Sequence, residues 1–329
     1  MIRRVGAGAA VVATALVLAT PHGFAQGQRD RGPRWFKTNL HSHTINSDGD
    51  STPYDLFAWY RRNGWNVLVI TDHNILTDTA PMQANGQLGA LVIQGEEITN
   101  EKNVHVNGIG VHTFVPPATG TITEILQTCI DRIRAAGGIP LINHPNWRFT
   151  IGVKDLLPLK NTGLLEIMSG YNLMNEYGDG RDVPSMEEAW DQLLTSGVRF
   201  WAVAVDDTHN LRQEFLPNRG NPGQAWVWVR AEALTEQAIL SALSSGDFYA
   251  STGVELTELT ATASSLTVDV KDNPDTRQRV VFIGKGGRVL QTSFDKPARY
   301  NFKGDEGYVR ARVEDSGGWR AWTQPVFLK

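Results

Sequence analysis

The chain has 329 residues, of which 41% are hydrophobic and 20% charged, enough to bury a sizeable core as one large domain with a smaller companion. A formal net charge of -4 gives no basis for expecting nucleic acid or a membrane surface as a partner. The single cysteine, Cys129, excludes an intrachain disulfide, so stability must come from the core and from any bound metal.

Residues 1–25 are predicted to be a secretory signal peptide. Arg3 and Arg4 give a positive start, residues 6–18 form a short apolar run, and Gly23-Phe24-Ala25 offers a small-residue cleavage site. The apolar run is shorter than the roughly 20 residues that span a bilayer, which favours cleavage over a membrane anchor. We therefore expect a periplasmic or secreted protein without membrane contact after cleavage.

From residue 34 onward, apolar strand-like runs alternate with helical patterns. Thr52 and Pro53 have the side chains of an N-cap and of a first helical turn, and Gly137-Gly138 is a typical helix stop. The predicted strands are 34–41, 65–70, 91–93, 105–110, 139–142, 164–167 and 200–205, and the predicted helices are 52–62, 122–136 and 185–196. Strands separated by helices imply parallel βα units, and a string of six or seven implies a barrel.

Histidines and carboxylates gather where these strands end. His41 and His43 share a face of an ideal strand and could bind one ion together, although two solvent-facing histidines at a strand end would give the same pattern. The five clusters are His41/His43/Asp48, Asp72/His73, Glu96/Glu97, Asn143/His144 and Asp207/His209. In a parallel barrel these ends meet on one face, so the clusters are expected to converge. His105 is the exception, because it begins its strand.

These motifs resemble those of the PHP (polymerase and histidinol phosphatase) family. His-Ser-His with Ser-Asp-Gly, then Ile-Thr-Asp-His-Asn, Gly-Glu-Glu-Ile-Thr, His105, Asn-His-Pro and Asp-Thr-His follow the family's order over residues 36–210. The resemblance implies a distorted TIM-like (β/α)7 barrel, here residues 34–254, with two or three divalent ions of zinc, manganese or iron. It also implies phosphoester hydrolysis.

The resemblance further implies which residues bind each ion. His41, His43, Glu97 and Asp207 would hold the first ion; Glu97, His105 and His144 would hold the second, with Glu97 bridging; Asp48, His73 and His209 would hold a third, where many family members have histidine in place of Asp48. Glu97 is preferred to Glu96 because the family pattern is glycine, any residue, glutamate. Imidazole and carboxylate ligands suit zinc, manganese and iron, and water on such ions becomes a hydroxide nucleophile near neutral pH.

Three further residues are candidates for roles beside the ions. Asp72 precedes a ligand and could orient His73 or accept a proton, or it could cap a loop. Arg148 and Arg181 could bind a substrate phosphate, or they could be ordinary surface arginines.

Beyond residue 254 no helical period remains. Alternating runs at 266–270, 280–283, 308–313 and 325–328, separated by glycine-rich turns, predict a small β-sandwich-like domain over residues 255–329. Trp319 and Trp322 could stack on a carbohydrate, or they could pack the sandwich or its contact with the barrel.

The sequence therefore predicts an exported metal-dependent hydrolase of a small-molecule ester, with a phosphoester as the favoured substrate. The alternative on the same metal centre is a carbamate, carboxylic ester or amide, because the chain also resembles a subgroup of the family with the Asn-His-Pro motif and a β-rich tail that includes hydrolases of carbamate or carboxylic esters. Trp147, Phe149 and Tyr171 would suit the apolar pocket of such an enzyme. The third hypothesis is a metal- or glycan-binding protein without turnover, which every expected ligand type argues against.

Overall fold

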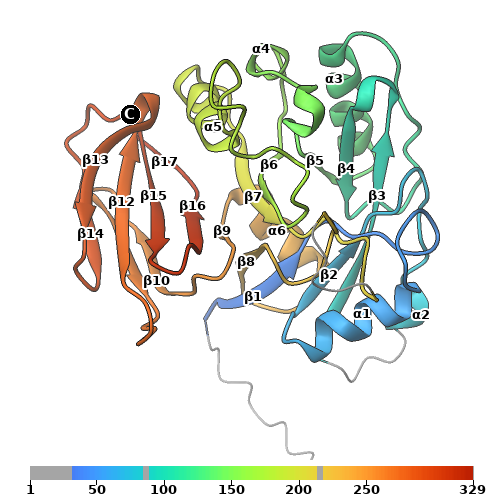
Figure 1. The fold of residues 1–329 in the computed structure, drawn as a ribbon, viewed down its shortest axis with the longest axis horizontal. Helices are drawn as coiled ribbons and strands as arrows, with labels where there is room; N and C mark the ends of the chain where they lie inside the picture. The colour runs from blue at the N-terminus through green and yellow to red at the C-terminus, as the bar shows by residue number, and fades with distance from the viewer. Residues whose placement is uncertain (1–31, 84–88, 213–217, 329) are drawn as a thin grey trace, which may run out of the picture. The chain divides into compact units, whose positions relative to one another are not determined.

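Figure 1 shows a computed structural model of the chain, which describes residues 32–83, 89–212 and 218–328. The predicted signal peptide, residues 1–25, lies outside the described residues. From Pro33 onward the chain forms one compact unit, and the predicted domain boundary after residue 254 falls inside that unit. Among the described residues, no helix is long and apolar enough to cross a membrane.

A large sheet runs through this unit in the order β13, β12, β15, β16, β9, β8, β1, β2, β3, β4, β5, β6, β7. The first nine strands along the chain are β1 (Arg34–Asn39), β2 (Val67–Ile70), β3 (Leu91–Thr99), β4 (His105–Ile109), β5 (Ile139–Ile142), β6 (Leu164–Ser169), β7 (Trp201–Val205), β8 (Trp226–Ala231) and β9 (Phe248–Ser251). Strands β2, β5 and β6 are buried along their whole length, which is why they appear in the sequence as apolar runs without alternation.

Strand β4 runs antiparallel to both of its neighbours, β3 and β5. The other predicted units of this part are parallel: β1 with β2, β2 with β3, β5 with β6, and β6 with β7. Thr99 near the end of β3 pairs with His105, and Asn143 N after β5 donates to the His105 carbonyl at 3.2 Å. The reversed direction brings the start of β4 to the edge where β3 and β5 end, which explains the position of His105.

The predicted closed barrel is not confirmed. In the described chain β7 pairs with β6, and the free edge of β1 is taken by β8 in antiparallel register. Beyond their ends β1 and β7 meet through a bridge between Ser42 and Thr208, where His43 N donates to the Thr208 carbonyl at 2.8 Å. A closed barrel would need β7 to pair with β1. Because β8 occupies that edge of β1, the sheet stays open.

The helices begin where the sequence places their caps. They are α1 (Pro53–Arg62), α2 (Ala80–Gln83), α3 (Ile122–Ala135), α4 (Val153–Leu156), α5 (Met186–Thr195) and α6 (Glu236–Ser245), with short 3-10 turns η1 (Glu101–Asn103), η2 (Trp147–Phe149) and η3 (Lys285–Gly287). Thr52, Thr121, Ser185 and Thr235 each accept a hydrogen bond from a backbone N–H of the first turn of α1, α3, α5 and α6. Helix α3 buries Cys129 with its apolar side.

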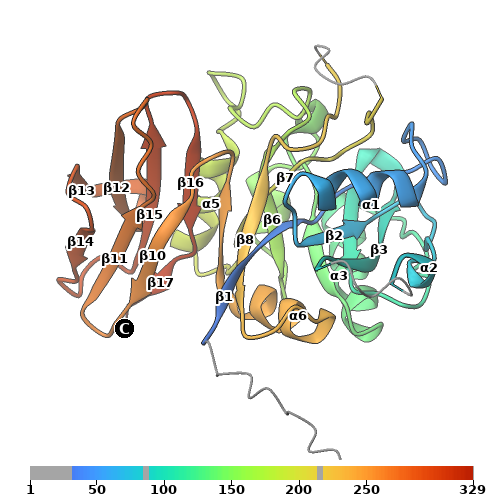
Figure 2. The same cartoon turned by 90° about the horizontal axis from the view of Figure 1, so that it is seen from below.

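The C-terminal strands form two layers. They are β10 (Leu256–Ala261), β11 (Ser265–Val270), β12 (Gln278–Gly284), β13 (Arg288–Ser293), β14 (Ala298–Asn301), β15 (Tyr308–Asp315), β16 (Arg320–Thr323) and β17 (Val326–Phe327). Strands β10, β11 and β14 make a separate sheet whose Val268 and Tyr300 share a core with Phe282 and Ala311 of the large sheet. This arrangement is sandwich-like. Figure 2 shows the C-terminal strands of both layers on the left of the view, with α1 and α3 on the right.

A buried ion-pair network joins α5 to β15. Arg310 Nε and Nη2 donate to the two oxygens of Asp191 at 2.9 and 2.6 Å, and Tyr308 Oη donates to Asp191 Oδ1 at 2.6 Å. Trp322 is buried, and its indole N–H donates to Glu187 Oε2 at 3.0 Å. Trp322 therefore packs the junction and cannot stack on a carbohydrate from solvent, whereas Trp319 is exposed.

Candidate metal centre

The nine predicted ligands lie together at one end of the sheet. They come from four connections and two strands: His41, His43 and Asp48 after β1, His73 after β2, Glu97 in β3, His105 at the start of β4, His144 after β5, and Asp207 and His209 after β7. His and carboxylate atoms from these residues form overlapping groups of three or four that are close enough to share an ion. The convergence predicted for a barrel is thus reached by an open sheet with one reversed strand.

The first group has the dimensions of a metal site. His41 Nε2 lies 3.1 Å from His43 Nε2, and Glu97 Oε2 lies 3.2 and 3.0 Å from these two nitrogens. Asp207 Oδ1 lies 3.1 and 3.3 Å from the same nitrogens. A tetrahedral zinc site with bonds of 2.0–2.1 Å has ligand-to-ligand edges of about 3.3 Å. Asp207 Oδ1 is buried without a hydrogen bond in the described chain, so an ion here would satisfy it.

The second group uses the other oxygen of Glu97. His105 Nδ1 lies 3.0 Å from Glu97 Oε1 and His144 Nε2 lies 3.6 Å from it, while Asn143 Nδ2 donates to Oε1 at 2.7 Å. The two oxygens of one carboxylate therefore face two different sets of nitrogens, as a bridging ligand requires. Burial alone would raise the pKa of Glu97, but His41, His73 and His105 outweigh it and hold that pKa well below its usual range.

The third group lies nearer the solvent. Asp48, whose side chain is 54% exposed, lies 3.4 Å from His209 Nε2 and 3.6 Å from both His73 Nε2 and His43 Nδ1. The three ligands predicted for a third ion thus lie together, and His43 joins them with its second nitrogen. Burial lowers the pKa of His209, but the charges of Asp207 and Asp48 outweigh it and raise that pKa to about 9. The group therefore attracts positive charge.

Two pairs of adjacent carboxylates, Glu96/Glu97 and Asp206/Asp207, lie near the histidine cluster. In each pair one side chain faces the histidines and the other binds the surrounding backbone. Glu97 and Asp207 face the histidines, whereas Glu96 Oε2 accepts the Val115 N–H at 2.9 Å and burial raises its pKa to about 7. Asp206 accepts the backbone N–H groups of residues 223–225 at 2.7–2.8 Å and the Tyr60 hydroxyl at 2.7 Å. Asp207 has a φ of +51°, a left-handed conformation that turns its side chain away from that of Asp206.

Asp72 serves the loop between the first two ligands and Asp48. Its oxygens accept the Thr44 N–H and hydroxyl and the Ser47 hydroxyl, all at 2.7 Å, and the Thr77 hydroxyl at 2.5 Å. Four hydrogen bonds saturate the carboxylate, and Asp72 does not line the cavity at the cluster. This placement fits the loop cap, so the catalytic role predicted for Asp72 is not supported.

Glu166 contacts the cluster and was missed in the sequence. It is buried in β6, and its Oε2 lies 3.4 Å from His41 Nδ1, while its Oε1 has no hydrogen bond in the described chain. Such a contact holds the proton of His41 on Nδ1 and leaves Nε2 free for a ligand bond. The signal was present, because Leu164-Leu165-Glu166-Ile167 puts one carboxylate inside an otherwise apolar strand.

A cavity of about 330 Å³ opens over the cluster. Its lining consists of Asp48, His73, Glu97, His105, His144, Trp147, Arg148, Tyr171, Leu173, Met174, Asp207 and His209. Arg148 therefore lies where a substrate would bind, and so do Trp147 and Tyr171 of the predicted apolar wall.

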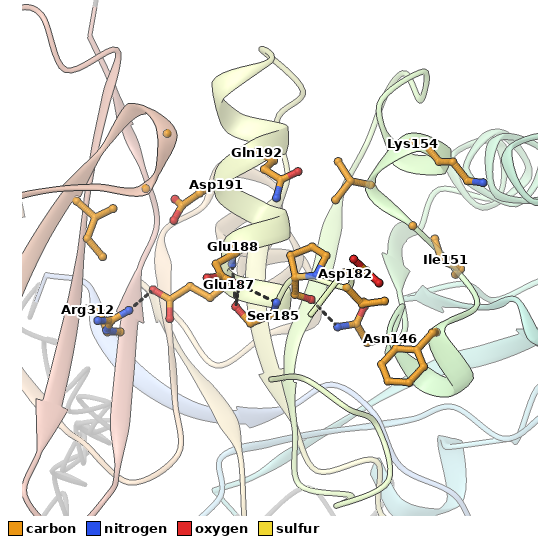
Figure 3. A pocket seen from close by; sticks show the side chains of 18 of the residues that line it. Asn146, Ile151, Lys154, Asp182, Ser185, Glu187, Glu188, Asp191, Gln192 and Arg312 are labelled. Atoms are coloured by element: carbon orange, nitrogen blue, oxygen red, sulfur yellow. Dashed lines mark hydrogen bonds and ion pairs between the residues drawn. The ribbon is translucent and has the colours of Figure 1, made fainter. Parts of the chain in front are cut away.

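Arg181 and Phe149, two other predicted pocket residues, line a different hollow of about 1000 Å³. Figure 3 shows this hollow around α5, with Glu187 and Asp191 on the helix and Arg312 on β15. In η2, Trp147 and Arg148 face the cluster while Phe149 faces the larger hollow. Neither residue lines the cavity over the cluster, so the structure favours the surface alternative for Arg181. The expectation for Phe149 is corrected, because the chain turns at residues 148 and 149.

No family model matches the chain, and no curated protein matches it. Among solved structures, it resembles a two-domain protein from Bacteroides vulgatus that contains a predicted PHP-like metal-dependent phosphoesterase, at 17% identity and a TM-score of 0.51, over 86% of this chain and 91% of that one. An amidohydrolase from Chromobacterium violaceum matches 54% of this chain and 89% of its own at 15% identity and a TM-score of 0.41. A lesion-specific endonuclease from Pyrococcus furiosus matches 64% and 56% at 12% identity and a TM-score of 0.43. The first likeness shows a shared fold over both parts of the chain.

Proposed function

We propose that the chain is a metal-dependent hydrolase of the PHP family, with a phosphoester as its favoured substrate. The observation that carries the proposal is the position of Glu97, whose two oxygens face two separate sets of histidine nitrogens. The shared fold with a PHP-like protein supports the same reading. Zinc, manganese and iron suit these mixed imidazole and carboxylate groups. We propose that the first two sets hold one ion each and that a third ion lies at Asp48, His73 and His209.

Bound ions would supply Lewis acidity, which lowers the pKa of a water molecule and polarises the ester. The chain's own residues prepare that chemistry. Glu166 keeps the His41 proton on Nδ1, and Asp72 fixes the loop that carries His43 and Asp48. Arg148 lines the cavity with a guanidinium that can hold an anionic oxygen of the substrate.

The alternative, a carbamate, carboxylic ester or amide hydrolase, would use the same ligands. Trp147 and Tyr171 in the cavity wall favour it, because they suit an apolar acyl group. Arg148 favours a phosphoester, because a neutral carbonyl substrate has no charge for a guanidinium to pair with. A cavity of about 330 Å³ suits a small molecule under either reading. The third hypothesis is a binding protein without turnover. Such a protein would not need a carboxylate that faces two ion sites, as Glu97 does.

The test uses two neighbouring glutamates. The full chain is stripped with chelator, reloaded with manganese or zinc, and assayed on an aryl phosphomonoester, an aryl phosphodiester and an aryl carbamate. We expect Glu97→Gln to lose bound metal and to lower kcat/KM by about 100-fold or more, because it removes a ligand that both ions share. Glu96→Gln is the matched control, since Glu96 faces the Val115 backbone.

Three results would contradict this proposal in different ways. Unchanged metal content and activity in Glu97→Gln would refute the ligand assignment. Turnover of the carbamate alone would move the enzyme to the alternative class. Full metal loading without turnover of any ester would favour a binding protein.

We also propose that the protein is exported. The support is the charged start, short apolar run and small-residue site of residues 1–25. Cell fractionation and N-terminal sequencing of the purified protein test this: a mature start at Gln26 outside the cytoplasm is expected, and an intact start in the cytoplasm would refute it.

A further inference from the structure

We infer that the substrate is a phosphodiester with one planar, apolar group, which lies between Trp147 and Tyr171 above the metal centre. This inference rests on the proposed function and specifies its substrate class. It comes from the positions of two aromatic rings and of one guanidinium in the cavity.

The two aromatic rings flank the cluster on different sides. The Trp147 ring centroid lies 5.2 Å from that of His105 and 5.5 Å from that of His144, which belong to the second ligand group. The Tyr171 ring lies 5.5 Å from His209, which belongs to the third group. A substrate whose phosphorus is at the ions therefore has an aromatic ring on either side within a cavity of about 330 Å³. Such faces favour flat, apolar groups by stacking.

Aliphatic side chains extend this wall. Leu173 and Met174 line the cavity from the segment that follows β6, and the side chain of Leu173 is 44% exposed. Covering an exposed leucine with a ligand is favourable because it removes apolar surface from water, and a methionine beside it can adapt to the ligand's shape. Four of the lining side chains, Trp147, Tyr171, Leu173 and Met174, thus select against a substrate that is polar throughout.

The two aromatic rings favour a substrate with two organic groups. Among the described residues of the lining, Arg148 is the one lysine or arginine, and its guanidinium lies 4.8 Å from the centre of the Trp147 ring. Bound ions would match the charge of a monoester or of a diester, and Asp48 is itself a predicted ion ligand, so charge does not separate the two esters. A diester has a second organic group that covers more of the apolar wall, whereas a monoester leaves part of that wall exposed to water.

Hydrolysis of such a diester balances without a further reactant. The oxygen of water forms a bond to phosphorus, and the bond between phosphorus and the departing oxygen breaks. One proton of the water ends on the departing alcohol, and the other goes to the monoester product or to solvent.

Two substrates with the same leaving group test the preference for a diester over a monoester. We expect metal-loaded full-length protein to hydrolyse methyl p-nitrophenyl phosphate with a kcat/KM at least 10-fold above that for p-nitrophenyl phosphate. Equal or better use of the monoester, with the activity abolished by chelator, would overturn this inference and leave the proposed phosphoesterase intact. Turnover of aryl carbamates alone would overturn both.

Matched variants test the stacking argument. Trp147→Leu should lower kcat/KM for the aryl diester about 5- to 10-fold, mostly through KM, with metal content unchanged, and Trp147→Phe should restore most of the loss. The control is Trp319→Leu, which changes an exposed tryptophan outside the cavity. An effect of Trp319→Leu as large as that of Trp147→Leu, or no effect of Trp147→Leu, would refute the role of the ring.

Binding without turnover separates this inference from the proposed function. Calorimetry with phenyl methylphosphonate and methyl methylphosphonate, both monoanions, compares a planar group with a small one on metal-loaded protein. Preference for the phenyl compound by about 10-fold, lost in Trp147→Leu, supports the recognition even if no ester is hydrolysed. Equal affinity for the two compounds overturns it even if phosphoesters are hydrolysed.

Discussion

Replacement of Glu166 by glutamine should weaken metal binding while it stabilises the metal-free protein. The 3.4 Å between Glu166 Oε2 and His41 Nδ1 is longer than the usual 2.9–3.0 Å, which indicates a weak hydrogen bond. Loss of carboxylates that orient ligand histidines costs 10- to 100-fold in metal affinity, so we expect the lower end, about 10-fold or about 1.4 kcal/mol. Glu166 Oε1 is buried without a hydrogen bond, so a neutral amide should raise the free energy of unfolding by about 1 kcal/mol.

Metal affinity and the stability of the metal-free protein are expected to change in opposite directions, which distinguishes this prediction from a general loss of structure. Zinc titration against a competing indicator measures affinity, and urea unfolding in chelator measures stability, each beside Glu96→Gln as a buried control away from the histidines. A merely structural Glu166 would lower stability and metal affinity together. Unchanged zinc affinity in Glu166→Gln would refute the argument that this carboxylate orients His41.

Two further predictions concern groups outside the metal centre. Asp191→Ala should lower the free energy of unfolding by about 3–5 kcal/mol, because it leaves Arg310 buried with half of its pairing and Tyr308 without an acceptor; a loss below about 1 kcal/mol in urea unfolding would contradict this. Burial raises the pKa of Glu176 from 4.5 to about 7, so the folded state binds the extra proton and loses stability as pH rises through that range. Glu176→Gln should therefore match the metal-free wild type at pH 4.5 and exceed it by up to about 3 kcal/mol above pH 7, and parallel curves of unfolding free energy against pH would refute the assignment.

The ligand set was predictable because histidines are few and most of them follow buried strands. The strand ends Ile142 and Val205 lie two residues before His144 and Asp207, and a strand end fixes where the next side chains lie. The choice of Glu97 over Glu96 came from the family pattern and not from the residues, since both are buried and one residue apart in β3.

The direction of β4 and the opening of the sheet were not predictable from periodicity. The apolar run at residues 105–109 does not indicate whether the strand is parallel or antiparallel to its neighbours. The connection from Thr99 to His105 is short enough for a hairpin. That shortness was the available signal, because a parallel crossover needs a dozen or more residues. The pairing of β1 with β8 joins residues about 190 positions apart, which local pattern does not encode.

The misplaced Phe149 follows from a backbone feature that sequence reasoning cannot see. Arg148 and Phe149 both have left-handed φ angles, +53° and +54°, so the chain turns and sends successive side chains into different hollows. Only glycine, and to a lesser degree asparagine or aspartate, occupies that region readily. The segment Trp-Arg-Phe-Thr at residues 147–150 contains none of these residues, so the sequence gives no sign of the turn.

The strain at Phe149 leads to a test in which the ordinary preference for alanine over glycine reverses. At a φ of +54° an L side chain costs roughly 1–2 kcal/mol that glycine avoids, and Phe149 is 45% exposed, so its ring contributes little packing. Phe149→Gly should therefore be more stable than Phe149→Ala by about 1 kcal/mol in urea unfolding, whereas at a right-handed position glycine would be the weaker by a similar amount. Both variants should keep the metal content of the wild type, since Phe149 faces away from the cluster. If alanine proved the more stable, residue 149 would not adopt the left-handed conformation, and the separation of the two hollows at η2 would have to be abandoned.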